Sequence, residues 1–465
     1  MGHFWFTRLS RNAEPQPRSN GMHLPAQKQP TFTAVRATSR DVRESLVEGG
    51  RGQAGSLGSQ RLGRVIVAAQ IAITMVLIVG AGLLGRSLMN VLDVNPGFRV
   101  DNIVTMDVSL PWQMDPNAKA RQVLFFSRLI DGLQRIPGVR KVGAASVLPL
   151  IEGGLPDGMY VLATQNEVPK TLDELLAMGR LKARVGSADF CVATDGYFQV
   201  VGIPLIRGRI FDERDGASAP HVAVISESLA RGQWPNQDPI GRTIEFGNMD
   251  SDLRLLTIVG IVGDTHEYGL DAPPRPTVYV NMFQRPRAEM TLTMLSDVET
   301  RSIASPARGL LQRLDPETPA KFQTFSQIYA ASLGSRRFNV ILIGFFGITA
   351  LLLATSGVFG VVAYSVSRRT REIGVRVALG ASTGAVLQMI LGQGMRTIVI
   401  GVAIGFAGAL VLTRAVKSLL FGVTTTDPLT FGSVTVLLVG TALFACYIPA
   451  RRATKIDPMV ALRHE

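Results

Sequence analysis

Two short acidic stretches contain the side chains best suited to chemistry. They are Asp212, Glu213 and Asp215 in RIFDERDG, and Asp264, His266 and Glu267 in VGDTHEYG. Carboxylates beside a histidine are the groups that act as general acids and bases or bind hard cations. Both stretches lie in polar turns, however, where such side chains usually stay solvated or bond to local backbone groups. We therefore expect them to be structural.

Other signatures of catalysis or metal binding are missing from the sequence. The two cysteines, Cys191 and Cys446, form no Cys-x-x-Cys motif, and the five histidines are scattered. Neither His-Glu-x-x-His nor the phosphate loop Gly-x4-Gly-Lys-[Ser/Thr] occurs, so no nucleotide is bound through that loop. The sequence predicts no catalytic residue, no metal and no cofactor in this chain.

The composition and the placement of charge indicate a membrane protein. The chain of 465 residues is 46% hydrophobic and only 18% charged, with a net charge of +12. Residues 95–337 are almost neutral, with 26 basic and 27 acidic residues, so the excess lies elsewhere and mostly flanks apolar runs. Basic residues beside membrane spans follow the positive-inside bias. This distribution argues against nucleic-acid binding, which needs a basic face on a folded domain.

Four apolar segments are long enough to cross a bilayer, which takes about 20 residues in a helix. We place them at 61–90, 336–366, 386–416 and 429–450. The start of the third, VLQMILGQGM, also fits a short interfacial helix. The fold class is an α-helical membrane protein with one span, a large extracytoplasmic α+β domain and three further spans.

Arginine counts beside the spans set the expected orientation. The loop 367–385 and the tail 451–465 are basic, whereas the loop 417–428 carries little charge. Both termini and the basic loop are therefore expected in the cytoplasm, and residues 95–335 and 417–428 on the outer side. Residues 1–33 lack an apolar signal core, and residues 1–60 are expected to be largely disordered.

The outer domain shows strand and helix patterns in a paired order. A strand at 103–111, a helix at 118–135 and the strand VRKVGAASVLP form one strand–helix–strand unit. A second unit comprises MTLTML, a helix opened by Ser305-Pro306 and KFQTF, with a β-rich insertion at about 150–285 between the units. After a predicted N-cap at Ser326, one rigid helix is expected to run into the second span.

Several motifs resemble a known family in the expected order. The run from RRFNVILIG through SRRTREIGVRVALGAS to IPARRATKIDPMVALRHE resembles the membrane module of FtsX/MacB-type ABC transporter permeases. DGYFQVVGIPLIRGRIFDERD, PIGRTIEFG and LTIVGIVGDTHEYG resemble the MacB-like periplasmic core domain. The resemblance covers about residues 60–465. It implies a multi-pass protein of the bacterial inner membrane that transmits conformational change during efflux, with ATP bound by an ABC ATPase subunit.

That resemblance also assigns a role to the basic loop. In such permeases the loop between the second and third spans is expected to contact the ATPase. The matching positions are Arg371, Glu372, Ile373, Gly374, Arg376, Ala378 and Gly380. Ile373, Val377 and Leu379 could dock to the partner or to the bilayer edge, and Gly380 would end the loop helix. The alternative is that the arginines only anchor the loop to anionic headgroups.

Two further patterns concern assembly. Gly401, Gly405 and Ala409 form a small-xxx-small stripe in the third span, suited either to packing within the chain or to a dimer face. Residues 34–46, AVRATSRDVRESL, match 450–462, ARRATKIDPMVAL, at six positions. We interpret 34–48 as the remnant of a preceding repeat, so that this chain resembles the C-terminal half of a tandem permease; coincidence is the alternative.

The expected partners are an ABC ATPase, a second permease half or a second copy, a periplasmic adaptor and membrane lipid. Two other functions remain open. One is a signalling module that controls an envelope hydrolase or a sensor without moving any substrate. The other is an inactive half-permease fragment. The sequence names no substrate.

Overall fold

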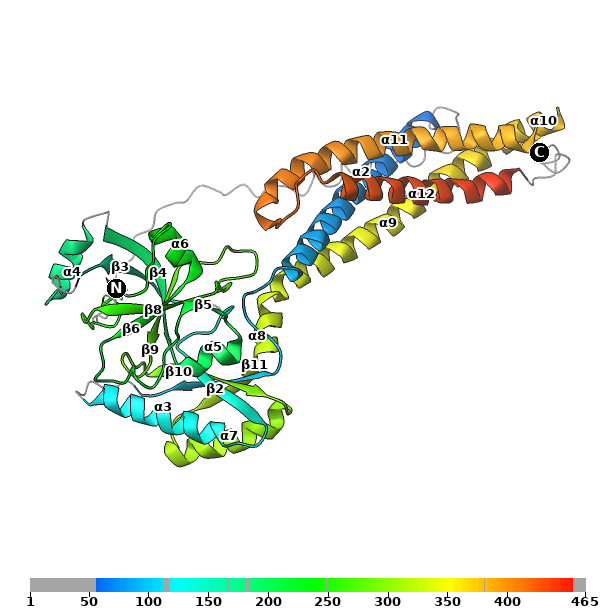
Figure 1. The fold of residues 1–465 in the computed structure, drawn as a ribbon. Helices are drawn as coiled ribbons and strands as arrows, with labels where there is room; N and C mark the ends of the chain where they lie inside the picture. The colour runs from blue at the N-terminus through cyan, green and yellow to red at the C-terminus, as the bar shows by residue number, and fades with distance from the viewer. Residues whose placement is uncertain are drawn as a thin grey trace, which may run out of the picture. The chain divides into compact units, whose positions relative to one another are not determined.

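The four apolar segments form four long helices (Figure 1). The computed structural model describes residues 56–454 except 112–116, 152, 165–167, 181–183, 248 and 380. The helices are α2 (Ser56–Leu92), α9 (Gly334–Arg368), α11 (Thr383–Ala415) and α12 (Pro428–Ala453). Each is long and apolar enough to cross a membrane. The predicted repeat at 34–48 and most of the tail lie outside the described residues.

The ends of these helices are set by ordinary capping chemistry. Ser382 caps α11 by accepting a hydrogen bond from the Ala385 amide at 3.3 Å, and Asp427 caps α12 by accepting from Thr430 at 2.9 Å. Pro428 occupies the first turn of α12, where a missing amide hydrogen costs nothing. Because α11 is continuous from Thr383, the alternative of a separate interfacial helix at its start is wrong.

The first part of the outer domain comprises four antiparallel strands at one end of a single large sheet, and two helices cover them. Its elements are β1 (Ile103–Ser109), α3 (Ala118–Gln134), β2 (Val139–Ala145), β10 (Glu289–Ser296), α7 (Thr300–Leu314) and β11 (Ala320–Thr324). The strand order is β11-β1-β10-β2, which is the ferredoxin-like order of two split βαβ units. The two predicted strand–helix–strand units are thus present and share one sheet.

The second part of the outer domain is inserted between these units and is rich in strands. It contains β3 (Asp157–Leu162), β4 (Val185–Ala193), β6 (Val222–Ser226), β7 (Thr243–Glu245), β8 (Leu256–Val262) and β9 (Thr277–Asn281), with β5 (Leu205–Gly208) paired to β8. The order β4-β3-β7-β8-β6-β9 closes on itself because β9 also pairs with β4. Short helices α4 (Leu172–Gly179), α5 (Asp195–Val201) and α6 (Glu227–Gln233) connect the strands.

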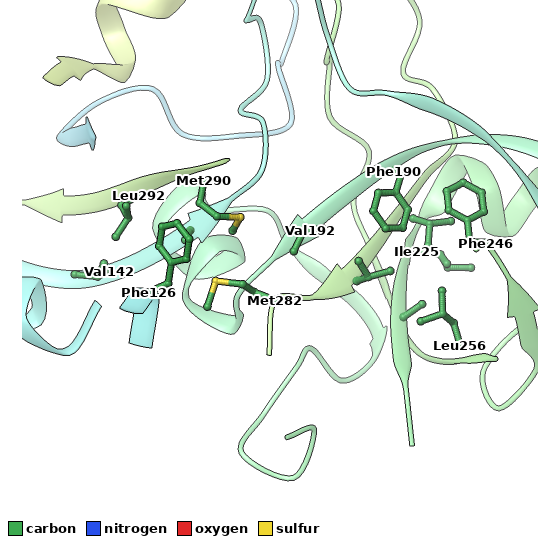
Figure 2. Close-up of a cluster of buried hydrophobic side chains, with 14 of the residues drawn as sticks. Phe126, Val142, Phe190, Val192, Ile225, Phe246, Leu256, Met282, Met290 and Leu292 are labelled. Carbon is green, nitrogen blue, oxygen red and sulfur yellow. The ribbon is translucent and has the colours of Figure 1, made fainter. Parts of the chain in front are cut away.

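One hydrophobic core joins the two parts of the outer domain (Figure 2). Phe126 of α3 packs with Val142 and Leu292 of the four-stranded sheet, while Phe190 and Phe246 stack with ring centroids 5.3 Å apart in the inserted part. Met282 and Val192 lie between these two groups in Figure 2. Burial of these large apolar side chains supplies the main driving force for folding the domain.

Two predicted helix starts are wrong. Helix α7 begins at Thr300, six residues before Pro306, because burying Ile303, Ala307 and Leu311 on one face outweighs the lost proline hydrogen bond. Helix α8 (Phe325–Ser332) is capped by Thr324, whose side chain and that of Gln327 form a capping box. Ser326 instead donates to the Val100 carbonyl at 3.2 Å.

The helix expected to run unbroken from the outer domain into the membrane is interrupted. Leu333 separates α8 from α9, although the Arg337 amide still bonds to the Leu333 carbonyl at 3.0 Å. Leu333 is buried in a second core cluster together with Phe98 and Phe325, whose rings stack 5.2 Å apart. The interruption is therefore held in place by packing.

Candidate functional site

The loop between α9 and α11 folds into a short helix, α10 (Thr370–Ala378), directly after α9 (Figure 1). Arg369 is the only residue between the two helices, and its carbonyl accepts a hydrogen bond from the Ile373 amide at 2.9 Å. Ile373 is 2% exposed and packs in the membrane-module core with Val362, Val366 and Ile390. These contacts attach α10 to α9 and α11.

Burial of Ile373 corrects one sequence expectation. A partner protein cannot dock on this side chain, because the chain's own helices already cover it. Its role is to hold α10 in place. Gly374 is buried as well. The structure describes neither Gly380 nor the side chains of Arg371, Val377 and Ala378, so their predicted roles stay predictions.

The opposite side of α10 carries charge and exposed apolar surface. Glu372 and Arg376 form an ion pair at 2.9 Å one helical turn apart, and both side chains are about half exposed. Arg376 also places Nη1 2.9 Å from the sulfur of Met389 in α11. Val375 is 40% exposed and Leu379 is 82% exposed. We call Glu372, Val375, Arg376 and Leu379 the α10 outer face.

Sequence reasoning found three of these four residues and missed Val375. Val375 lies four residues before Leu379, a spacing that places two side chains on one helix face. That signal was present in the sequence. Large exposed apolar side chains beside charged ones are typical of surfaces that bind other proteins, whereas isolated exposed apolar residues need no explanation.

The small-residue stripe of α11 faces α2 of the same chain. A methyl group on Gly405 would lie 2.7 Å from Cβ of Met75 and 2.9 Å from the Ala72 carbonyl oxygen. Gly401 meets Ile71 and Ala68 in the same way. Ala409 is fully buried. The stripe was expected either to pack within the chain or to form a dimer face. This structure shows packing within the chain.

The far end of α9 contacts the outer domain. Arg336 in its first turn forms an ion pair with Asp271, which lies between β8 and β9. Leu333, just before α9, is buried with Phe98 and Phe325. An ion pair and a buried apolar contact thus fix the start of α9 to the outer domain, while α10 follows its end.

The acidic stretches of the outer domain serve mainly structural purposes. Asp215 is buried and accepts two hydrogen bonds from Arg209, at 2.6 and 2.9 Å, and one from the Asp212 amide. Asp264 accepts from the amide of Ser228 near the start of α6 at 2.7 Å. Within the described ranges, no group of three or more His, Cys, Asp or Glu side chains is placed to hold a metal.

Glu267 departs from the expectation that these carboxylates are solvated. It is 3% exposed, and the Thr265 hydroxyl donates to it at 2.5 Å. Burial raises the pKa of Glu267 to about 7. Asp189 is buried nearby, and burial raises its pKa to about 6, although Arg275 and the Tyr268 hydroxyl lower it. Both groups lie in the core, away from the membrane helices.

Comparison with protein families decides the identity. The profile of the MacB-like periplasmic core domain matches residues 66–318, more than half of the chain, and that of the FtsX-like permease C-terminal region matches residues 344–458. The chain belongs to the FtsX/MacB-type permease family. With four apolar helices among the residues that the structure describes, this permease is a multi-pass protein of the inner membrane.

Curated relatives of the permease are longer proteins. The macrolide export ATP-binding/permease protein MacB of Neisseria meningitidis serogroup A is 28% identical over 66% of this chain and 49% of its own length. The pyoverdine export ATP-binding/permease protein PvdT of Pseudomonas savastanoi pv. phaseolicola is 27% identical over 77% of this chain and 59% of its own. The chain spans about half the length of the curated relatives it matches.

Among solved structures, the periplasmic region of MacB from Actinobacillus actinomycetemcomitans is similar to this permease. It aligns with 52% of this chain and 97% of its own, at 16% identity and a TM-score of 0.33.

Proposed function

We propose that this permease is the membrane subunit of an ABC transporter that drives export by transmitting movement to its outer domain. ATP would be hydrolysed by a separate ATPase subunit that docks on the α10 outer face. The observation that carries the proposal is the division of α10 into a buried anchor, Ile373, and an exposed mixed face centred on Glu372 and Arg376. The names of the relatives, which combine ATP binding with export, support a link between ATP and export and do not bear on whether the ATPase is a separate subunit.

The proposed relay uses contacts at both ends of α9. A push on α10 would reach α9 through the packing of Ile373 against Val362 and Val366. Helix α9 has 35 residues, which corresponds to a length of about 50 Å. At its other end, the Arg336–Asp271 ion pair and buried Leu333 would pass the movement to the outer domain. No continuous substrate channel is needed.

The arrangement in the cell belongs to the same proposal. Both termini and the loop 367–385 would face the cytoplasm, and residues 95–335 and 417–428 would face the periplasm, as the arginine distribution indicates. A second permease half or a second copy would complete the membrane unit, and a periplasmic adaptor would contact the outer domain. Transported cargo is left unspecified, because the relatives' names differ in substrate.

Charge reversal on the α10 outer face tests the docking proposal. The full chain is co-purified from its native membrane with the ATP-binding protein that accompanies it, and ATP hydrolysis is measured in lipid nanodiscs. Glu372→Arg should lower ATPase activity about tenfold or more, because a reversed charge places like charges against each other at the interface, which costs several kcal/mol. Loss of the helix's own ion pair is worth only about 0.3–0.5 kcal/mol, too little to unfold α10.

Two matched variants separate docking from local helix stability. Glu227→Arg breaks a similar pair, Glu227–Arg231 at 3.3 Å on α6 of the outer domain, and should leave ATPase activity unchanged. Glu372→Arg/Arg376→Glu restores an ion pair with reversed polarity and should stay defective, because the partner meets the wrong charges. Wild-type association and activity in Glu372→Arg would refute the docking proposal.

A further inference from the structure

A narrow pocket lies between the membrane helices beside α10. It is a tight space that is partly open to the surroundings. Its walls come from α2, α9, α10 and α11. The lining extends from Val358 in α9 to Arg369 just after it, eleven helical steps or about 16 Å along the helix. The pocket is therefore a slot that runs along the membrane helices.

The slot is apolar along most of its length and carries two basic side chains. Val358, Val362 and Ile398 form part of its apolar walls, while Arg64 and Arg369 contribute guanidinium groups. Arg369 terminates α9, so its charge lies at the end of the slot that is farthest from Val358. A cation at one end and hydrocarbon walls along the rest match an amphiphile with an anionic head and an acyl chain.

The two guanidinium groups have spare capacity to bind an anion. Arg369 donates through Nη1 to Oε1 of Gln393 at 3.3 Å, a neutral partner. In the part of the chain that the structure describes, neither Arg64 nor Arg369 forms an ion pair with a carboxylate, and no carboxylate lines the slot. Arginine prefers phosphate and carboxylate oxygens, which it can bind through two parallel hydrogen bonds.

We propose that this slot binds one anionic phospholipid of the surrounding membrane, with its phosphate between Arg64 and Arg369 and one acyl chain along Val362 and Ile398. The site requires only that the four helices span a membrane. Ile373 of α10 also lines the slot, so a bound lipid would brace α10 against α9 and α11. That consequence, unlike the lipid site itself, rests on the proposed coupling function.

Lipid retention by the purified full chain tests the proposal. The chain is delipidated in mild detergent and incubated with phosphatidylglycerol or with phosphatidylcholine carrying the same acyl chains. Bound lipid is then counted by native mass spectrometry. We expect one tightly held phosphatidylglycerol on the wild type. Arg64→Gln/Arg369→Gln should bind it roughly thirtyfold more weakly, the effect of removing two basic residues near an anionic headgroup.

Two further variants make the result decisive. Arg451→Gln/Arg452→Gln removes the same charge from the exposed end of α12, outside the slot, and should retain lipid as the wild type does. Ser365→Phe fills the slot while leaving both guanidinium groups, and should also lose the lipid. Equal losses in the two arginine variants, equal retention of phosphatidylcholine, or wild-type retention in Ser365→Phe would each overturn the proposal.

Discussion

The outer domain and the membrane module of this permease differ in where they place large aromatic and aliphatic side chains. In the outer domain Phe126, Phe190 and Phe246 are buried. In the membrane module Ile341 and Phe345 point outward, with 70% and 64% of their surfaces exposed. Small residues occupy several positions that touch neighbouring helices there, among them Gly347, Ala354, Gly401, Gly405 and Ala409, beside larger buried side chains such as Met75 and Ile398.

The difference follows from the solvent that each region meets. Water drives large apolar side chains into a common core, because removing their surface from water is favourable. Lipid tails give no such drive, so membrane helices associate through close backbone packing, which small residues permit. A phenylalanine should therefore matter more for stability in the outer domain, and a glycine should matter more for stability in the membrane module. Substitutions can test this directly.

The largest expected effect is in the outer-domain core. Phe126 is fully buried between α3 and the sheet, so Phe126→Ala should lower the free energy of unfolding of this domain by about 3–5 kcal/mol. Hydrogen exchange of the β2 and β10 amides in the full chain would report it. Phe345→Ala, the matched change on a lipid-facing position of α9, should leave the exchange of α9 nearly unchanged. Similar losses in both would contradict the comparison.

A glycine should matter more in the membrane module than a phenylalanine does. Gly405→Ala forces a methyl group against Met75 and the backbone at Ala72 and should cost about 1–3 kcal/mol through overpacking. Thermal unfolding in nanodiscs would measure the loss. Gly392 lies on the same helix with nothing within 4 Å of a built methyl group. Gly392→Ala should be neutral or stabilising, since alanine favours the helix; destabilisation of equal size at both sites would contradict the packing role.

A smaller difference concerns pH. Burial raises the pKa of Glu267 from its ordinary 4.5 to about 7 in the folded outer domain. The folded state therefore binds more protons than the unfolded state between these values, so stability is greatest below pH 4.5 and falls as pH rises through 7. Glu267→Gln should reduce the decrease of the free energy of unfolding between pH 5 and pH 7.5 by on the order of 1 kcal/mol. Hydrogen exchange of the β4 and β9 amides at the two pH values would measure it. An unchanged pH slope would contradict it. Asp189 and Glu245, whose pKa values burial also raises, leave a residual slope.

Much of the fold could be predicted because long-range patterns determine it. Uninterrupted apolar runs marked the four long helices, and alternation marked strands such as 103–109. Local signals were less reliable. Ser305-Pro306 looks like a helix start, yet the burial of Ile303 extends α7 to Thr300. Thr324 and Ser326 are both good caps, and only the tertiary contact of Ser326 with Val100 decides between them.

The sequence indicated where along the chain the candidate site lies, but it did not indicate which side chains of the site are exposed. The motif located α10, yet its pattern could not say that Ile373 faces the membrane helices while Val375 and Leu379 face outward. Helix periodicity determines which side chains of α10 share a face. The way α10 folds back on α9 determines which face is buried. The slot proposed to bind lipid was not foreseen, because Arg64 and Arg369 lie 305 positions apart in the sequence and line one slot only through packing of α2 against α9 and α11.

The proposed coupling requires contact between the α10 outer face and an ATP-binding partner. A photo-crosslinking amino acid placed at Leu379, 82% exposed on that face, would test it directly in native membranes. The matched control is Val436 on α12, which is 73% exposed on a membrane-spanning helix. We predict a crosslink to an ATP-binding protein from position 379 and none from 436. Crosslinks to lipid alone from position 379, in a preparation where the ATP-binding protein still co-purifies, would contradict the account.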